Sequence, residues 1–161
     1  MEATSEHTDP DKTHRKEYVN DNNWLSESLD VPKEKASIFI SGQNGGDILV
    51  LALKTSTILK KVVLLPNTKP GWNPKSNPNV KLIEIYVSEE KPDLDFDKND
   101  RETLVKCGTF YQMTKPDEIL PITLSCEKCM PYGKYVIVRL GLNDDHMRIT
   151  EIALYGHEIE L

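Results

Sequence analysis

The stretch that decides how the whole chain is interpreted is KYVIVRLGLNDDHMRITEIALYG, from Lys134 to Gly156. Within it, residues 135–140 and residues 149–156 alternate so that every second side chain falls on the same face of an extended strand. The glycine, asparagine and aspartates of residues 141–145 are typical of a turn. The stretch therefore predicts two strands that form a core hairpin or lie beside each other in a sheet.

Other alternating or branched apolar segments predict the remaining strands, at residues 37–40, 47–53, 58–65, 80–87, 103–112 and 119–126. Residues 47–53 and 58–65 are dense in branched apolar side chains, which favours central strands that are buried on both faces. In this interpretation a turn at residues 54–57 separates them.

The length of 161 residues fits one domain, long enough to bury about 70% of its unfolded surface in a single core. Residues 1–16 are polar and charged, a composition that cannot bury enough surface to offset the entropy lost on ordering. We therefore expect a flexible tail over residues 1–16 and one β-sandwich domain over residues 17–161.

The net charge of −6 argues against a general nucleic-acid binder, which needs a basic surface to neutralise phosphates. No apolar run approaches the roughly 20 residues that a membrane-spanning helix requires. The first seven residues lack the apolar core of a secretory signal. The chain is thus expected to be cytoplasmic, or a trimmed form of a secreted or cell-surface protein.

Two segments carry a resemblance to a known family: Lys134–Val136 and Ile149–Gly156 are similar to the closing strands of discoidin-like domains (F5/8 type C, galactose-binding-like). The pattern is closest to the fucose-binding branch, the fucolectins. The central strands also match this pattern, at Leu53, Ile58, Val62 and Leu64. The resemblance extends from about Tyr18 to Gly156 and implies an all-β fold, an antiparallel jelly-roll β-sandwich.

A cluster of oxygen-bearing side chains precedes Trp24, at Asn20, Asp21 and Asn23. Hard cations such as calcium are held by carboxylate, amide and backbone oxygens. The resemblance implies a structural calcium held by these residues together with Glu151 of the closing strand, although the family's glycine is missing here. The alternative is an ordinary Asx turn with Trp24 as a core residue.

Acidic residues also alternate at Asp93, Asp95 and Asp97, but the glycine and the closing glutamate of an EF-hand loop are absent. A solvated loop is expected there.

The segment from residue 66 to residue 79 contains four prolines, which exclude it from a sheet and predict an excursion to the surface. It carries Trp72 between Lys69 and Lys75. An indole stacks on the apolar face of a sugar while lysines contact its hydroxyl groups, so the trio suits a carbohydrate platform. The same trio suits docking to an anionic membrane, and Trp72 could also fold back onto the core.

The resemblance implies that ligands bind loops at one end of the sandwich, at residues 20–24, 42–47 and 67–79. Asn44 and Asn67 join Lys69, Trp72 and Lys75 as the candidate ligand-binding residues. The Arg-x-Asp motif of fucolectins is replaced by Thr-Lys-Pro at residues 68–70, and no histidine lies near residue 43. Fucose specificity is therefore not implied.

Three cysteines are present, an odd number that leaves at least one without an intramolecular partner. The resemblance implies a disulfide between Cys107 and Cys126. Cys126 and Cys129 also form a C-x-x-C motif, which is typical of zinc or redox sites only in a context that this sequence lacks.

No signature of a hydrolase, metalloprotease or nucleotide-binding enzyme occurs, so we expect a protein without catalytic activity. The leading hypothesis is a lectin-like module of cell-surface recognition whose ligand is a glycan or a glycoprotein. The alternatives are a protein–protein interaction module of a multi-subunit assembly and an anionic-membrane docking domain.

Overall fold

The computed structural model describes residues 2–3, 8–9, 12–13, 39–40, 48–66, 81–112, 121–140 and 148–158. Within these ranges the regular structure is almost entirely β-strand, with one 3-10 turn, η3 (Phe96–Lys98). The strands are β1 (Glu2–Ala3), β2 (Thr8–Asp9), β3 (Lys12–Thr13), β4 (Phe39–Ile40), β5 (Ile48–Pro66), β6 (Lys81–Ser88), β7 (Val105–Gln112), β8 (Ile122–Ser125), β9 (Tyr132–Leu140) and β10 (Arg148–Glu158). The predicted all-β class is confirmed.

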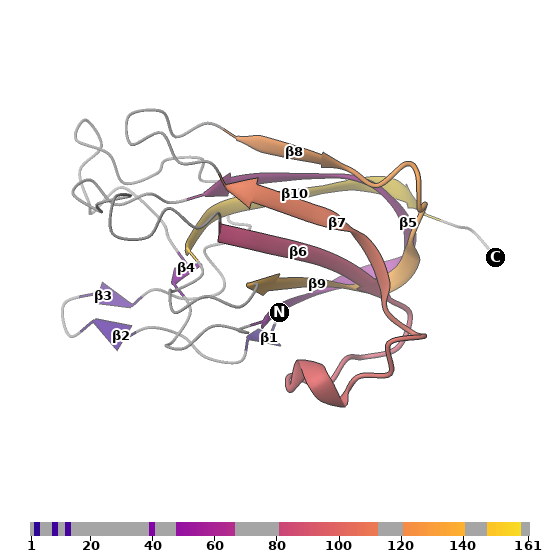
Figure 1. Cartoon of the computed structure of the whole chain (residues 1–161), viewed down its shortest axis with the longest axis horizontal. Helices are drawn as coiled ribbons and strands as arrows, with labels where there is room; N and C mark the ends of the chain where they lie inside the picture. Colours follow the sequence, from indigo (N-terminus) through magenta and orange to yellow (C-terminus); the bar gives the residue numbers. More distant parts are fainter. Residues whose placement is uncertain are drawn as a thin grey trace.

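The strands form a two-layered antiparallel sandwich whose layers are joined by β5 (Figure 1). The first half of β5 pairs with β9, which pairs with β6, and β6 pairs with β7. The second half of β5 lies between β10 and β8, and β4 pairs with the outer side of β10. Since β5 bends back on itself, both of its ends lie on the same side of the molecule (Figure 1).

The structure corrects two details of the predicted strands. Residues 54–57 keep strand conformation, so β5 is one strand with a sharp bend and an irregular register between Ala52 and Thr57. No glycine or proline occurs in residues 54–57, so nothing forces the backbone out of the extended region. In addition, β9 and β10 form neither a hairpin nor a neighbouring pair, because β5 lies between them in the strand order.

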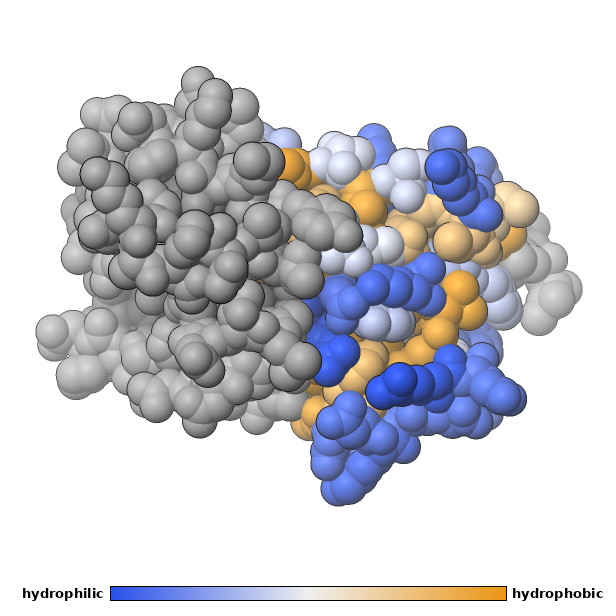
Figure 2. Space-filling model, viewed as in Figure 1, coloured by the Kyte–Doolittle hydropathy of each residue, from blue (hydrophilic) through white to orange (hydrophobic). Residues whose placement is uncertain are grey.

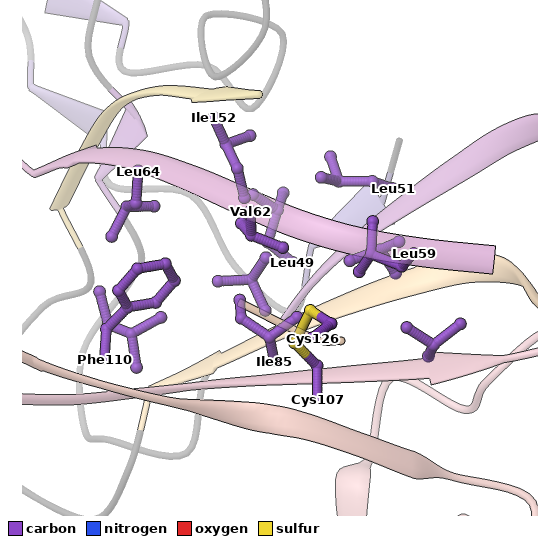
Figure 3. Close-up of a cluster of buried hydrophobic side chains, with 14 of the residues drawn as sticks. Leu49, Leu51, Leu59, Val62, Leu64, Ile85, Cys107, Phe110, Cys126 and Ile152 are labelled. Atoms are coloured by element: carbon purple, nitrogen blue, oxygen red, sulfur yellow. A yellow bond between two sulfur atoms is a disulfide. The ribbon is translucent and has the colours of Figure 1, made fainter. Parts of the chain in front are cut away.

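The main core lies between the two layers and takes inward side chains of the strands β5 to β10 (Figure 3). Leu49 and Leu51 of β5 and Ile85 of β6 come from one layer, and Val62 and Ile152 come from the other; each is 5% exposed or less. Burying one such aliphatic side chain contributes about 1.5–3 kcal/mol to stability.

A smaller apolar cluster covers the outer face of the first layer. Ile48, Val50 and Ile137 point away from the main core and are buried, and the partly buried residues packed on them are Tyr86, Leu94, Phe96, Leu104 and Tyr135. Three of these, Leu94, Phe96 and Leu104, belong to the connection between β6 and β7. The first half of β5 is therefore buried on both faces, as the branched apolar run predicts.

A disulfide joins Cys107 of β7 to Cys126, the residue after β8, with their Cα atoms 4.9 Å apart. It lies within the main core and links the edge strand of one layer to the edge strand of the other (Figure 3). The disulfide implied by the sequence resemblance is confirmed. Cys129 is an exposed free cysteine.

The first sixteen residues contain three two-residue strands. β1 pairs with Leu49 and Val50 of β5, and β2 pairs with β3. The predicted boundary between residues 16 and 17 lies outside the described residues and stays a prediction.

Candidate functional site

At one end of the sandwich, strands of both layers begin or end close to one another. We call this end the loop end. In one layer, the register places Ile48 opposite Arg139 and Lys81 opposite Gln112. In the other, Ile149 lies opposite Pro66, and Arg148 lies opposite Ile40. The loop end therefore contains the strand ends that flank four segments of the chain, residues 41–47, 67–80, 113–120 and 141–147 (Figure 1).

The predicted ligand-binding residues belong to segments that attach at the loop end. Asn44 precedes the start of β5 by four positions. Asn67, Lys69, Trp72 and Lys75 lie between the end of β5 and the start of β6. These five residues are outside the described part of the chain, so the structure positions the strand ends that flank them and tests none of their side chains.

One of the four predicted calcium ligands, Glu151, is described. Its side chain is only 2% exposed on β10, opposite Leu65 and close to the loop end. Oε1 accepts a hydrogen bond of 3.0 Å from the backbone N–H of Ile152. A buried carboxylate requires compensation by hydrogen bonds or by a cation. The other three ligands, at residues 20, 21 and 23, lie outside the described residues.

Among the described residues, no group of three or more His, Cys, Asp or Glu side chains is arranged to hold a metal ion. In the acidic connection between β6 and β7, the side-chain amide of Asn99 donates hydrogen bonds to the carbonyl oxygens of Asp93, Asp95 and Phe96, at 2.9, 3.2 and 3.2 Å. These hydrogen bonds hold the connection in a compact turn.

A charged cluster that sequence reasoning missed lies on the outer face of the first layer. The carboxylate of Glu84 on β6 lies 2.5 Å from Nζ of Lys106 on β7 and 3.3 Å from Nη1 of Arg139 on β9. The Arg139 guanidinium also stacks on the ring of Phe96, 4.1 Å from its centroid. That ring lies 5.1 Å from the ring of Tyr86, centroid to centroid.

Burial and charge act in opposite directions on this cluster. Burial raises the pKa of Glu84, but the hydrogen bond and positive charge of Lys106, assisted by Arg139, outweigh it and hold that pKa below its ordinary value. Burial, and then the negative charge of Glu84, raise the pKa of Tyr86. Glu84 is therefore ionised and Tyr86 neutral at neutral pH.

The cluster fastens the connection between β6 and β7 to the sheet, because Arg139 contacts both Glu84 and Phe96. In the sequence, alternation indicates that Glu84 and Tyr86 share one face of a strand and that Arg139 lies on one face of another strand. Alternation does not specify which strands pair. It therefore does not show which cation contacts which carboxylate.

Hydrophobic and hydrophilic residues are interspersed over the described strands on the face shown in Figure 2. The large apolar side chains that are well exposed in the described part of the chain are Val105, Met130 and Tyr155. No helix within these ranges is long and apolar enough to cross a membrane.

No protein-family model matches the sequence, and no curated protein matches it either. Solved structures do share its fold. A fucolectin from the serum of striped bass, Morone saxatilis, has a TM-score of 0.68 at 14% identity, covering 99% of this chain and 46% of the lectin. The chain thus spans less than half of that lectin's length.

Two other solved structures are similar over nearly their whole length. The C-terminal domain of a chitobiase from Bacteroides fragilis has a TM-score of 0.66 at 13% identity, with 99% of this chain and 93% of that domain covered. The family 32 carbohydrate-binding module of NanJ from Clostridium perfringens, in complex with galactose, has a TM-score of 0.61 at 12% identity, with 95% and 90% covered. The expected discoidin-like, galactose-binding-like β-sandwich is confirmed as the fold.

Proposed function

We propose that this chain, which has the discoidin-like β-sandwich fold, is a non-catalytic module that binds glycans at its loop end. The observation that carries the proposal is the convergence of strand ends from both layers at one end, on either side of the segment that contains Trp72. A fold likeness to a lectin and to a carbohydrate-binding module supports it. Fold alone does not establish function, so the proposal depends on the site.

In this proposal Trp72 provides the stacking surface for a sugar ring. Lys69 and Lys75 donate hydrogen bonds to hydroxyl groups, and the amides of Asn44 and Asn67 add donors and acceptors. Lysine is a single point charge rather than the bidentate fork of arginine, so we expect a ligand other than the fucose that the fucolectin motif selects.

A glycan array with the full chain, followed by titration calorimetry of the best ligand, tests this function. Trp72→Ala should weaken binding about tenfold or more, because aromatic stacking contributes about 1.4 kcal/mol. Tyr155→Ala is the matched control, since it removes an exposed aromatic ring from β10 at the other end of the sandwich. An array without binding by the folded protein, or equal losses in both variants, would contradict the proposal.

The same experiments separate the alternatives. Binding to liposomes that contain anionic lipid, lost at high salt and with Trp72→Ala, would indicate membrane docking instead. A stable protein partner that is captured equally well after Trp72→Ala, together with an empty array, would indicate an interaction module.

We also propose a structural calcium ion held by Asn20, Asp21, Asn23 and Glu151. The burial of the Glu151 carboxylate near the loop end supports this proposal. Calcium at a hundredfold excess over its dissociation constant should add about 2.7 kcal/mol to the stability. Thermal unfolding with calcium and with EDTA measures this. Glu151→Gln should abolish the difference, whereas exposed Glu90→Gln should preserve it.

A further inference from the structure

The disulfide is shielded from solvent, whereas the remaining cysteine is not. Cys107 is 8% exposed and Cys126 is 1% exposed, and both belong to the main core (Figure 3). Disulfides are reduced by direct attack of a thiolate on one of the two sulfur atoms, so burial of both sulfurs hinders a thiol that approaches from solvent. Cys129 is exposed and carries a free thiol.

A tight turn brings Cys129 to Cys126. The backbone N–H groups of Cys129 and Met130 both donate to the carbonyl oxygen of Cys126, at 3.1 and 2.9 Å. A hydrogen bond between residues i and i+3 defines a turn whose first and last Cα atoms are less than about 7 Å apart. Disulfides span Cα separations up to about 6.8 Å, so the turn has the dimensions of a disulfide-bonded pair.

The same turn is held in place at both ends. The N–H of Cys126 donates to the carbonyl oxygen of Lys60 at 2.7 Å, and Pro131 accepts from the N–H of Leu59 at 2.9 Å. Met130 has a φ of 39°, a left-handed conformation that closes the turn. These contacts keep Cys129 near Cys126.

We propose that Cys129 is a resolving thiol for the buried disulfide. The Cys129 thiolate attacks Sγ of Cys126, a Cys126–Cys129 bond forms, and the Cys126–Cys107 bond breaks. The electron pair of the broken bond leaves with Cys107, whose thiolate then takes a proton from water. One disulfide and one thiol exist before and after the step, so it needs no oxidant or reductant.

The exchange moves the disulfide from the core to the surface and releases the link between β7 and β8. A solvent thiol can then attack the exposed sulfur of Cys129 and reduce the chain completely. The redox state of the surroundings thereby controls, through the exposed Cys129, whether β7 and β8 stay linked by the disulfide.

Disulfide mapping tests the exchange directly. Trypsin cleaves after Lys106, Lys128 and Lys134 but not at Lys115, which precedes a proline, so Cys107 and Cys126 share one peptide and Cys129 lies on the next. The oxidised full chain is incubated at alkaline pH without reductant, blocked with N-ethylmaleimide and digested. We expect a growing fraction in which the two peptides are linked through Cys126 and Cys129, with the maleimide on Cys107 instead of Cys129.

Reduction kinetics provide the second measurement. Under native conditions, dithiothreitol should reduce the disulfide of Cys129→Ser about tenfold more slowly than that of the parent chain. In guanidinium chloride the two rates should be equal, because unfolding exposes every sulfur. The control is Ser125→Ala, which removes a small polar side chain next to the same turn. Its disulfide should be reduced at the same rate as that of the parent chain. The proposal requires both results; absence of the linked peptide, or equal native rates for Cys129→Ser and the parent, overturns it.

Discussion

The Glu84 side chain shows how one residue can connect three strands. Its carboxylate meets Lys106 of β7 and Arg139 of β9, so a single charge joins β6 to both neighbours. The carboxylate is only 16% exposed and Lys106 is 44% exposed, so solvent screens the two ion pairs only in part. The ionised form is favoured in the folded state because the two cations outweigh the effect of burial.

The lowered pKa of Glu84 predicts a pH dependence of stability. Because the folded-state pKa is below the unfolded value of about 4.3, the stabilisation is present above that value and is lost as pH falls through the folded value. Glu84→Gln should lower the free energy of unfolding by about 1 kcal/mol at pH 7, and the difference from the parent should shrink below about pH 4.

Urea denaturation between pH 3 and pH 7 measures this difference. Exposed Glu90→Gln controls for the loss of one carboxylate. A difference between Glu84→Gln and the parent that stays constant over this pH range would contradict the prediction.

At the scale of elements, the approach of β9 to the end of β6 depends on a residue without a side chain. A Cβ atom on Gly133 would lie 2.4 Å from the backbone carbon and oxygen of Ser88, far inside van der Waals contact. Backbone atoms of a paired strand cannot move aside without breaking the ladder between the two strands. At Gly108 the nearest atom to such a Cβ is the Leu124 Cδ1, at 3.0 Å, which belongs to a side chain that can rotate.

These two glycines make a matched pair for mutation. Gly133→Ala should lower the free energy of unfolding by about 1–3 kcal/mol, the usual cost of overpacking a rigid site. Gly108→Ala should cost clearly less, because Leu124 can adjust. Chemical denaturation of the two variants and the parent gives the comparison, and equal losses would show that backbone contact at Gly133 is not the determinant.

At the scale of the whole molecule, the bend of β5 and the Cys107–Cys126 disulfide both join the two layers. The disulfide links the edge strands β7 and β8. The bend also returns the chain to the loop end, where strand ends from both layers meet. The architecture thus gathers several connecting segments at one end of the sandwich.

The disulfide should contribute strongly to the stability of this framework. With the linked positions 19 apart in the sequence, the chain-entropy model gives about 3 kcal/mol. The double variant Cys107→Ala/Cys126→Ala should therefore melt roughly 10 °C below the oxidised parent in calorimetry. Cys129→Ala, which leaves this disulfide intact, should have the same melting temperature as the parent. A loss of less than about 1 kcal/mol in the double variant would contradict the entropic account.

Most of the long strands, and the apolar faces of those strands, follow from the amino-acid sequence alone. Alternation along the chain identified β6, β7, β9 and β10 because the period of two is a local property of extended backbone. The closing strands and the cysteine positions also carried the resemblance that implied the fold and the disulfide, and both are confirmed.

The order of the strands in the sheets, in contrast, emerges only when the chain is folded. Alternation is equally satisfied by any partner, so β9 and β10 were expected together although β5 separates them. The ion pairs of Glu84 could not be foreseen for the same reason, since Lys106 and Arg139 reach it across strands from distant parts of the chain. Local periodicity specifies the conformation of a segment, whereas pairing and charge contacts depend on the free energy of the whole assembled sandwich.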